Sequence, residues 1–151
     1  METVLVTGAS GLLGQTVVAK LAKTHKYHVV AVVSGRRKVS FAENVQVEAC
    51  DLLEEKERIA LLHQVRPHLI CHLAWSLGDG AFLESENNLK WLEASLHIIR
   101  LFAECGGRRF VFAGSSSEYG QTVGGCSENA PLPQYSLYGT AKLAFEKMAE
   151  L

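Results

Sequence analysis

Three glycines near the start of the chain restrict its fold more than any other feature. Gly8, Gly11 and Gly14 directly follow the apolar run 4–6 and open a segment, 12–23, whose apolar residues recur at helical spacing. In such a turn the first glycine permits the bend, the second admits a pyrophosphate and the third lets helix and strand pack closely. An ordinary strand-to-helix turn is the alternative. The pattern predicts a dinucleotide-phosphate loop lined by Gly8, Ser10, Gly11, Leu12, Leu13 and Gly14.

Short apolar runs alternate with longer amphipathic segments along the rest of the chain. Strands are expected at 4–6, 28–33, 45–49, 69–73 and 109–113, and helices at 12–23, 53–65, 83–105 and from 138 onward. Strands without clean polar alternation, separated by helices, favour a parallel sheet covered on both faces. The predicted fold class is α/β, a doubly wound parallel sheet of the Rossmann type in three layers, forming one domain over 1–151.

Charge and cysteine content exclude several classes of function. Fifteen Lys and Arg against 16 Asp and Glu give a formal charge of −1, which provides no field to attract nucleic acid or an anionic membrane. The four cysteines form no CxxC pair and are expected to be reduced thiols. No signal-like or membrane-length segment is present, so a cytoplasmic protein with a small-molecule ligand and no metal site is expected.

The last third of the chain holds residues suited to proton transfer. Tyr138 and Lys142 are four residues apart, so a helix places both side chains on one face. About twenty residues earlier, the serine-rich segment 114–120 follows the strand predicted at 109–113. A polar turn after a buried strand is the alternative interpretation of that segment.

Together these motifs resemble the extended branch of the short-chain dehydrogenase/reductase superfamily, and the resemblance covers essentially the whole chain. The branch has a TGxxGxxG loop, matched at 7–14, and a YxxxK helix. The resemblance implies that Tyr138 is the general acid/base and that Lys142 holds the nicotinamide-ribose hydroxyls. It also implies that Ser115, four residues before Tyr119, hydrogen-bonds the reacting carbonyl, with Ser116 as the alternative.

The same resemblance implies further cofactor contacts. Asp51 and Leu52, after the third strand, match the family segment that contacts the adenine, although Asp51 could instead cap a helix. Leu73 and Ala74 match an element whose backbone lines the cofactor, and Trp75 stands where a second alanine is usual. The preceding His72 is expected to be a packed strand residue.

The end of the second strand bears on which cofactor is used. Ser34 stands where an NAD enzyme of this fold usually has an acidic residue for the ribose hydroxyls. Arg36 and Arg37 follow and could pair with a 2′-phosphate, although a solvated basic loop is the alternative. NADP is therefore favoured over NAD.

The two serines after Ser115 make dehydration less expected among the reactions that the resemblance implies. Sugar-nucleotide dehydratases of the family carry acidic residues there, whereas this chain has Ser116 and Ser117, with Glu118 one place further on. The substrate is therefore expected to be a nucleotide-sugar that undergoes 4-keto reduction or epimerisation. A related oxidoreductase of a non-sugar carbonyl, and a cofactor-binding regulatory protein without turnover, are the alternatives.

Family members usually continue for over a hundred residues beyond the YxxxK helix, into a lobe that grips the nucleotide-sugar. The chain is therefore expected to lack most of this substrate lobe, as an amino-terminal fragment or a truncated protein. Alone it is expected to bind cofactor without turnover. If the protein forms a homodimer, the helices before and after the serine-rich loop are the expected interface.

Overall fold

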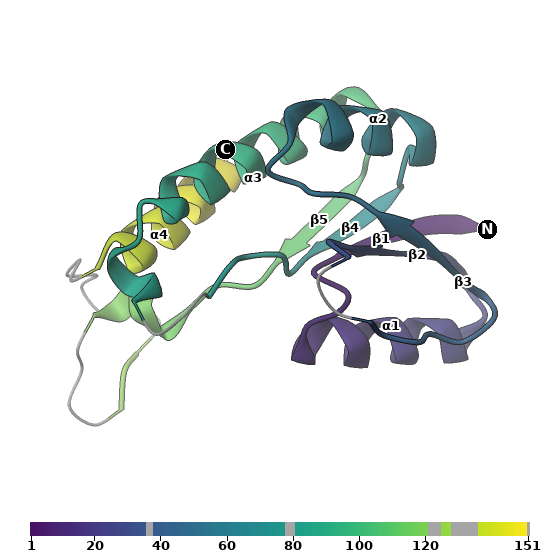
Figure 1. Ribbon diagram of the computed structural model, residues 1–151, viewed down its shortest axis with the longest axis horizontal. Coiled ribbons are helices and arrows are strands. Elements are labelled where there is room, and N and C mark those ends of the chain that lie inside the picture. The colour runs from purple at the N-terminus through teal and green to yellow at the C-terminus, as the bar shows by residue number, and fades with distance from the viewer. Residues whose placement is uncertain (36–37, 78–80, 121–124, 128–135, 151) are drawn as a thin grey trace. The chain divides into compact units, whose positions relative to one another are not determined.

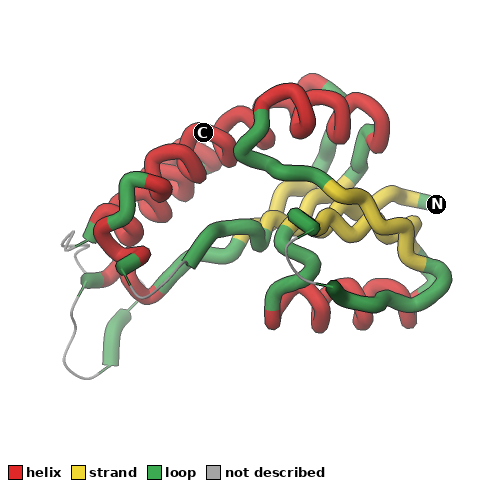
Figure 2. The backbone as a smooth tube through the Cα atoms, in the orientation of Figure 1, coloured by secondary structure: helices red, strands yellow, loops and turns green. Residues whose placement is uncertain are grey.

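The computed structural model describes residues 1–35, 38–77, 81–120, 125–127 and 136–150 (Figures 1 and 2). The chain divides into two units, each with its own internal contacts. The first unit contains 1–75 and 97–113, and the second contains 76–96 and 114–151.

Five parallel strands form the sheet of the first unit. They are β1 (Glu2–Thr7), β2 (Tyr27–Val33), β3 (Val45–Ala49), β4 (Leu69–His72) and β5 (Arg109–Phe112). Their order is β3-β2-β1-β4-β5, with Val4 of β1 paired to Val29 on one side and to Leu69 on the other. The chain thus builds outward from β1 to β3 and then returns to the other side of β1. This reversal is the switch point at which open α/β sheets bind ligands.

Burial differs between the central and the outer strands. The last four residues of β1 and four consecutive residues of β2 are buried, because these strands have neighbours on both sides and helices over them. The outer strands β3 and β5 alternate instead, and Val47 and Val111 are 49% and 51% exposed. The expectation that the strands have no solvent side is therefore wrong for β3 and β5, because each has only one neighbouring strand in this sheet.

Helices α1 (Leu12–Thr24) and α2 (Glu55–Val65) cover opposite faces of this sheet (Figure 1). Val18 and Ala22 of α1, one turn apart, are buried in a core with Val4, Val6 and Val29. A parallel sheet with helices on both faces confirms the predicted α/β, Rossmann-type fold.

The described part of the second unit contains two short 3₁₀ turns, η1 (Phe82–Glu84) and η2 (Ser116–Tyr119), and the helix α4 (Leu137–Ala149). The helix α3 (Asn87–Glu104) begins in this unit and ends in the first. It was expected from residue 83, which is wrong, because the buried Asn88 side chain donates to the carbonyls of Phe82 and Ser85 and holds these residues in a separate turn. Within the described ranges, no helix combines the length and the apolar character that a membrane span needs.

Candidate functional site

Gly8 brings two of the predicted cofactor segments together. It has a φ of +66°, a conformation that side chains rarely adopt. A Cβ there would lie 2.7 Å from the amide nitrogen of Ala74 and 2.8 Å from the carbonyl carbon of Leu73. The glycine loop therefore lies directly against the segment that follows β4, as expected if both contact one ligand.

The preceding Thr7 ties these two segments together, a role that the sequence did not reveal. Its buried Oγ1 accepts hydrogen bonds from the amides of Leu73 at 3.1 Å and Ala74 at 3.2 Å, and lies 2.8 Å from Nδ1 of His72. His72 is itself buried against the ring of Phe110, as expected of a packed strand residue. One hydroxyl thus fixes the backbone beside the glycine loop.

The other two glycines of the loop, Gly11 and Gly14, differ in whether packing requires them. A Cβ on Gly14 would lie 2.2 Å from the carbonyl oxygen of Gly8, so close packing of the loop requires this glycine. A Cβ on Gly11 would approach only the Gly8 carbonyl oxygen, at 3.2 Å, and would otherwise face open space. Packing within the protein therefore accounts for a glycine at position 14 far better than for one at position 11. The surface at Gly11 is open to a ligand.

The amino end of α1 fits a phosphate. Gly11 is its N-cap residue and supplies no side-chain hydrogen bond to the first turn, which also contains no acidic residue. Leu12 and Leu13 are 85% and 61% exposed at this end of the helix, an unusual place for apolar side chains. Helix amides that lack a side-chain cap, beside a glycine surface, form a cradle that a pyrophosphate would fill.

Ser34, Asp51 and Leu52 lie at the carboxyl ends of neighbouring strands. Val33 of β2 pairs with Ala49 of β3, so Ser34 and Asp51 come just beyond the same edge of the sheet as the glycine loop. The loop is tied to this edge by a hydrogen bond from the Ala9 amide to the Val32 carbonyl. Arg36 and Arg37, proposed for a 2′-phosphate, lie outside the described residues.

Asp51 does not cap the helix that follows. The N-cap of α2 is Glu54, while Oδ1 of Asp51 accepts from the amide of Leu53 at 3.1 Å and closes a local turn. Leu52 within that turn is buried. The alternative interpretation of Asp51 as a helix cap is therefore wrong.

Ser115 occupies the start of η2 in a capping box. Its Oγ accepts from the amide of Ser117 at 3.1 Å, and its own amide donates to Oε1 of Glu118 at 2.6 Å. This arrangement fixes the Ser115 side chain and leaves its hydroxyl proton available for a further donation. Ser116, the alternative, is exposed.

Tyr138 and Lys142 lie on α4, and both are buried. The rings of Phe82 and Tyr138 pack in a T-shaped arrangement with centroids 5.2 Å apart, which fixes the phenol. A Cβ on Gly139 would lie 2.2 Å from the carbonyl oxygen of Ser117, so α4 lies directly against η2. The second unit thus brings the Ser115 turn together with the helix that carries Tyr138 and Lys142.

Glu118 is a buried acid that the sequence pattern S-x-x-E could have indicated as a capping residue. Burial raises the pKa of Glu118 above its ordinary value, and a hydrogen bond shared with Glu146 of α4 raises it further. Burial likewise lowers the pKa of Lys142, while the charge of Glu118 opposes that shift. A carboxyl group that readily holds a proton therefore lies between the Ser115 turn and Lys142.

We predict that Glu118→Gln removes part of the pH dependence of stability. Because the folded protein holds the Glu118 proton more tightly than the unfolded chain, this stabilisation is complete below the ordinary pKa of 4.5 and is lost as the pH rises through the raised pKa. Glutamine keeps an oxygen for the Ser115 amide but cannot titrate. Urea unfolding across pH 4–8 should give a flatter profile than for wild type or for exposed Glu86→Gln. Parallel profiles for all three proteins would contradict the assignment.

The first unit has the architecture of a class, the Rossmann-type parallel sheets with a glycine-rich loop after β1. The model of the NAD dependent epimerase/dehydratase family matches residues 4–151. The chain belongs to this family.

Three curated relatives match most of the chain. The chain is 30% identical to an uncharacterized UDP-glucose epimerase, YtcB, of Bacillus subtilis (strain 168), over 98% of this chain and 51% of the relative. It is 28% identical to the dTDP-6-deoxy-L-talose 4-dehydrogenase (NAD(+)) of Aggregatibacter actinomycetemcomitans, over 92% and 51%. It is 30% identical to methionine adenosyltransferase 2 subunit beta of Xenopus laevis, over 95% and 41%. The chain thus spans about half the length of these relatives or less.

Solved structures share the fold. The UDP-Glc/GlcNAc 4-epimerase of Campylobacter jejuni superposes with a TM-score of 0.84 at 21% identity, over 98% of this chain and 48% of that one. The Bordetella bronchiseptica enzyme WbmG, solved in complex with NAD, gives 0.83 at 15% identity, over 99% and 49%. At these identities the likeness establishes the architecture alone.

Proposed function

We propose that this chain is the cofactor-binding and proton-transferring part of an enzyme that oxidises and reduces C4 of a nucleotide-sugar. One observation carries the proposal: the second unit packs the Ser115 turn against the helix that bears the buried Tyr138 and Lys142. A protein that only binds a dinucleotide does not require that arrangement. The UDP-glucose epimerase and the dTDP-sugar dehydrogenase among the relatives support the substrate class.

The cofactor would be held along the carboxyl edge of the sheet. The glycine cradle and the first turn of α1 would bind the pyrophosphate, and Asp51 would accept from the adenine amino group. Leu73 and Ala74 would contribute backbone beside the pyrophosphate, because Gly8 packs directly on them. The bound nicotinamide would supply the hydride acceptor and donor.

The residues of the second unit would handle the proton. Ser115 would donate its hydroxyl proton to the oxygen at C4, since its own oxygen already accepts from Ser117. Tyr138 would take the proton of that C4 hydroxyl during oxidation and return it during reduction. Lys142 would bind the ribose hydroxyls, and its positive charge would favour the phenolate.

The serine-rich turn supports redox chemistry at C4 over dehydration. Elimination of water needs an acid or base beside the carbonyl-binding serine, and Ser116 and Ser117 have no carboxyl group. The carboxyl group of Glu118 is buried and accepts from the Ser115 amide. It therefore serves the turn, which supports epimerisation or 4-keto reduction.

The test follows a deuterium label at C4 of UDP-glucose, supplied to the full-length gene product with NAD⁺ or NADP⁺. If the hydride moves to the nicotinamide and back, the C4 epimer should keep its deuterium. Loss of the label to water, or no reaction of any UDP- or dTDP-hexose or its 4-keto derivative, would contradict the proposal.

We expect tighter binding of NADP⁺ than of NAD⁺, because Ser34 presents no carboxylate to repel a 2′-phosphate. Equal or tighter NAD⁺ binding would contradict that preference.

A second candidate is a cofactor-binding regulatory protein without turnover. It is favoured by the Xenopus laevis relative, which is named as a subunit of methionine adenosyltransferase. The buried Tyr138 and Lys142 beside the Ser115 turn argue against it. Dinucleotide binding without label transfer to or from any nucleotide-sugar would favour this candidate.

A further inference from the structure

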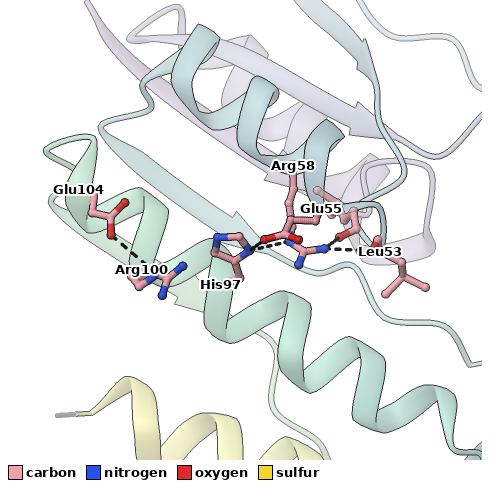
Figure 3. A network of polar contacts seen from close by, with 7 residues as sticks. Leu53, Glu55, Arg58, His97, Arg100 and Glu104 are labelled. Carbon is pink, nitrogen blue, oxygen red and sulfur yellow. Dashed lines mark hydrogen bonds and ion pairs between the residues drawn. The ribbon is translucent and has the colours of Figure 1, made fainter.

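The turn at 51–53, between β3 and α2, is held by the guanidinium group of Arg58 (Figure 3). Nη1 of Arg58 donates to the carbonyl oxygen of Leu53 at 3.0 Å and to that of Leu52 at 3.3 Å. Arg58 is only 4% exposed, although it lies in a helix rich in charged residues. A single buried group therefore fixes two successive carbonyls of the turn.

Glu57, the residue before Arg58 in α2, fixes the same turn through its side-chain carboxylate. Oε2 of Glu57 accepts from the Asp51 amide at 2.7 Å, and Oδ1 of Asp51 accepts from the Leu53 amide. The direction of the Asp51 side chain thus depends on a turn held by two adjacent residues of α2.

His97 of α3 holds the other side of the guanidinium group. Nε of Arg58 donates to Nδ1 of His97 at 3.0 Å, which requires a neutral imidazole at that nitrogen. Burial lowers the pKa of His97, and the charges of Arg58 and Arg100 lower it further, while Glu55 and Glu104 oppose the shift. Figure 3 shows Arg58 and Glu55 beside the imidazole, and the ion pair of Arg100 with Glu104 further along α3. The hydrogen bond is therefore intact near neutral pH and is lost when His97 is protonated.

Stability alone does not account for a buried arginine at this position. Desolvation of a guanidinium is costly, and apolar residues that replace buried ionic groups are often neutral or stabilising. Leu61 and Leu62 show that α2 packs leucine on its buried side. The positions of the Arg58 donors point instead to control of the backbone at 52 and 53.

We propose that Arg58 is a positioning residue that orients Asp51 toward the adenine of the dinucleotide, and that neutral His97 completes this clamp. The proposal rests on the proposed function, since it needs a dinucleotide whose adenine end lies at the Asp51 turn. It adds two residues that do not touch the cofactor, and a dependence of adenine recognition on pH.

The first test measures base selectivity. Affinities for NAD⁺ and for nicotinamide hypoxanthine dinucleotide, which has a carbonyl in place of the adenine amino group, are compared in wild type, Arg58→Leu and Arg58→Lys. Wild type and the exposed Lys56→Leu on the same helix should prefer adenine. Arg58→Leu should reduce that preference by about tenfold, the effect of one misplaced hydrogen bond to a charged group, and Arg58→Lys should restore part of it. Equal weakening for both dinucleotides, as a structural defect would give, overturns the proposal.

The second test varies the pH and does not depend on the stability of an Arg58 variant. NAD⁺ affinity of wild type should fall as the pH decreases below the ordinary histidine pKa of 6.5, because His97 gains its proton through its lowered pKa. His97→Gln keeps an oxygen that can accept from Arg58 and cannot titrate, so its affinity should stay level. Parallel profiles overturn the proposal. A wild-type protein that binds neither dinucleotide refutes the proposed function, and this proposal with it.

Discussion

Tyr138→Phe should lower turnover of a nucleotide-sugar by about 10²- to 10⁴-fold, the usual contribution of a positioned general acid/base. The substitution removes the proton carrier but keeps the ring, whose packing against Phe82 fixes it in the second unit. Cofactor affinity should change little, because the phosphate and adenine contacts that we propose are made by residues of the first unit. Steady-state kinetics of the full-length gene product, with dinucleotide titrations, measure both quantities.

Tyr119→Phe is the matched control, since it removes a hydroxyl of the same kind from the same unit. It should retain turnover within a few-fold of wild type. If Tyr138→Phe also retains it, the proton-transfer role is wrong. If both variants lose turnover and thermal stability together, the lost turnover reflects lost folding. That result would contradict proton transfer by Tyr138 as the reason for the loss.

Gly11→Val should abolish dinucleotide binding, by at least about a hundredfold, while the protein stays folded. The backbone of Gly11 has φ −78° and ψ 171°, a region that valine adopts readily. Among the described residues, a Cβ there would closely approach only the Gly8 carbonyl oxygen, so the valine side chain would extend into the space that we propose for the pyrophosphate. Calorimetric titration measures binding, and circular dichroism with thermal unfolding measures the fold.

Substitutions at two other glycines serve as controls that distinguish a loss of dinucleotide binding from a loss of packing. At Gly125 an added Cβ would meet no atom of the described residues within 4 Å beyond its chain neighbours, so Gly125→Val should change neither binding nor stability. Gly14→Ala places a methyl group against backbone atoms of the loop and should lower stability by about 1–3 kcal/mol or more. If Gly11→Val binds as wild type does, the phosphate-loop assignment is wrong.

The fold was predictable because its signals are local. The glycine loop, the β-branched runs and the helical spacing of 12–23 each concern a few neighbouring residues, and each predicted strand was found to within two residues at either end. The start of α3 was missed because the side chain of Asn88 captures carbonyls that a continuous helix would use. The spacing of apolar residues, from which the helix was predicted, does not show that a side chain will compete with the backbone for these carbonyls.

The site was predictable only where a motif fixed it. Thr7 gave no chemical signal, because its role depends on β4 lying beside β1. Arg58 looked like one more charge on a solvated helix, and its burial depends on α3, some forty residues further along the chain. Glu118 carried a local signal, the capping-box spacing, but its neighbour Glu146 comes from a distant helix. Residues whose partners lie far away in sequence need the tertiary structure to be interpreted.

Hydrogen–deuterium exchange with and without NAD⁺ or NADP⁺ tests most directly whether a dinucleotide binds along the carboxyl edge of the sheet. We predict protection of amides in three segments that only the tertiary fold brings to one edge: 8–14, 50–53 and 73–75. The exposed side of α2, on the same unit, should exchange at an unchanged rate. No protection of these three segments at saturating dinucleotide, or protection confined to the exposed side of α2, would contradict the proposed binding site.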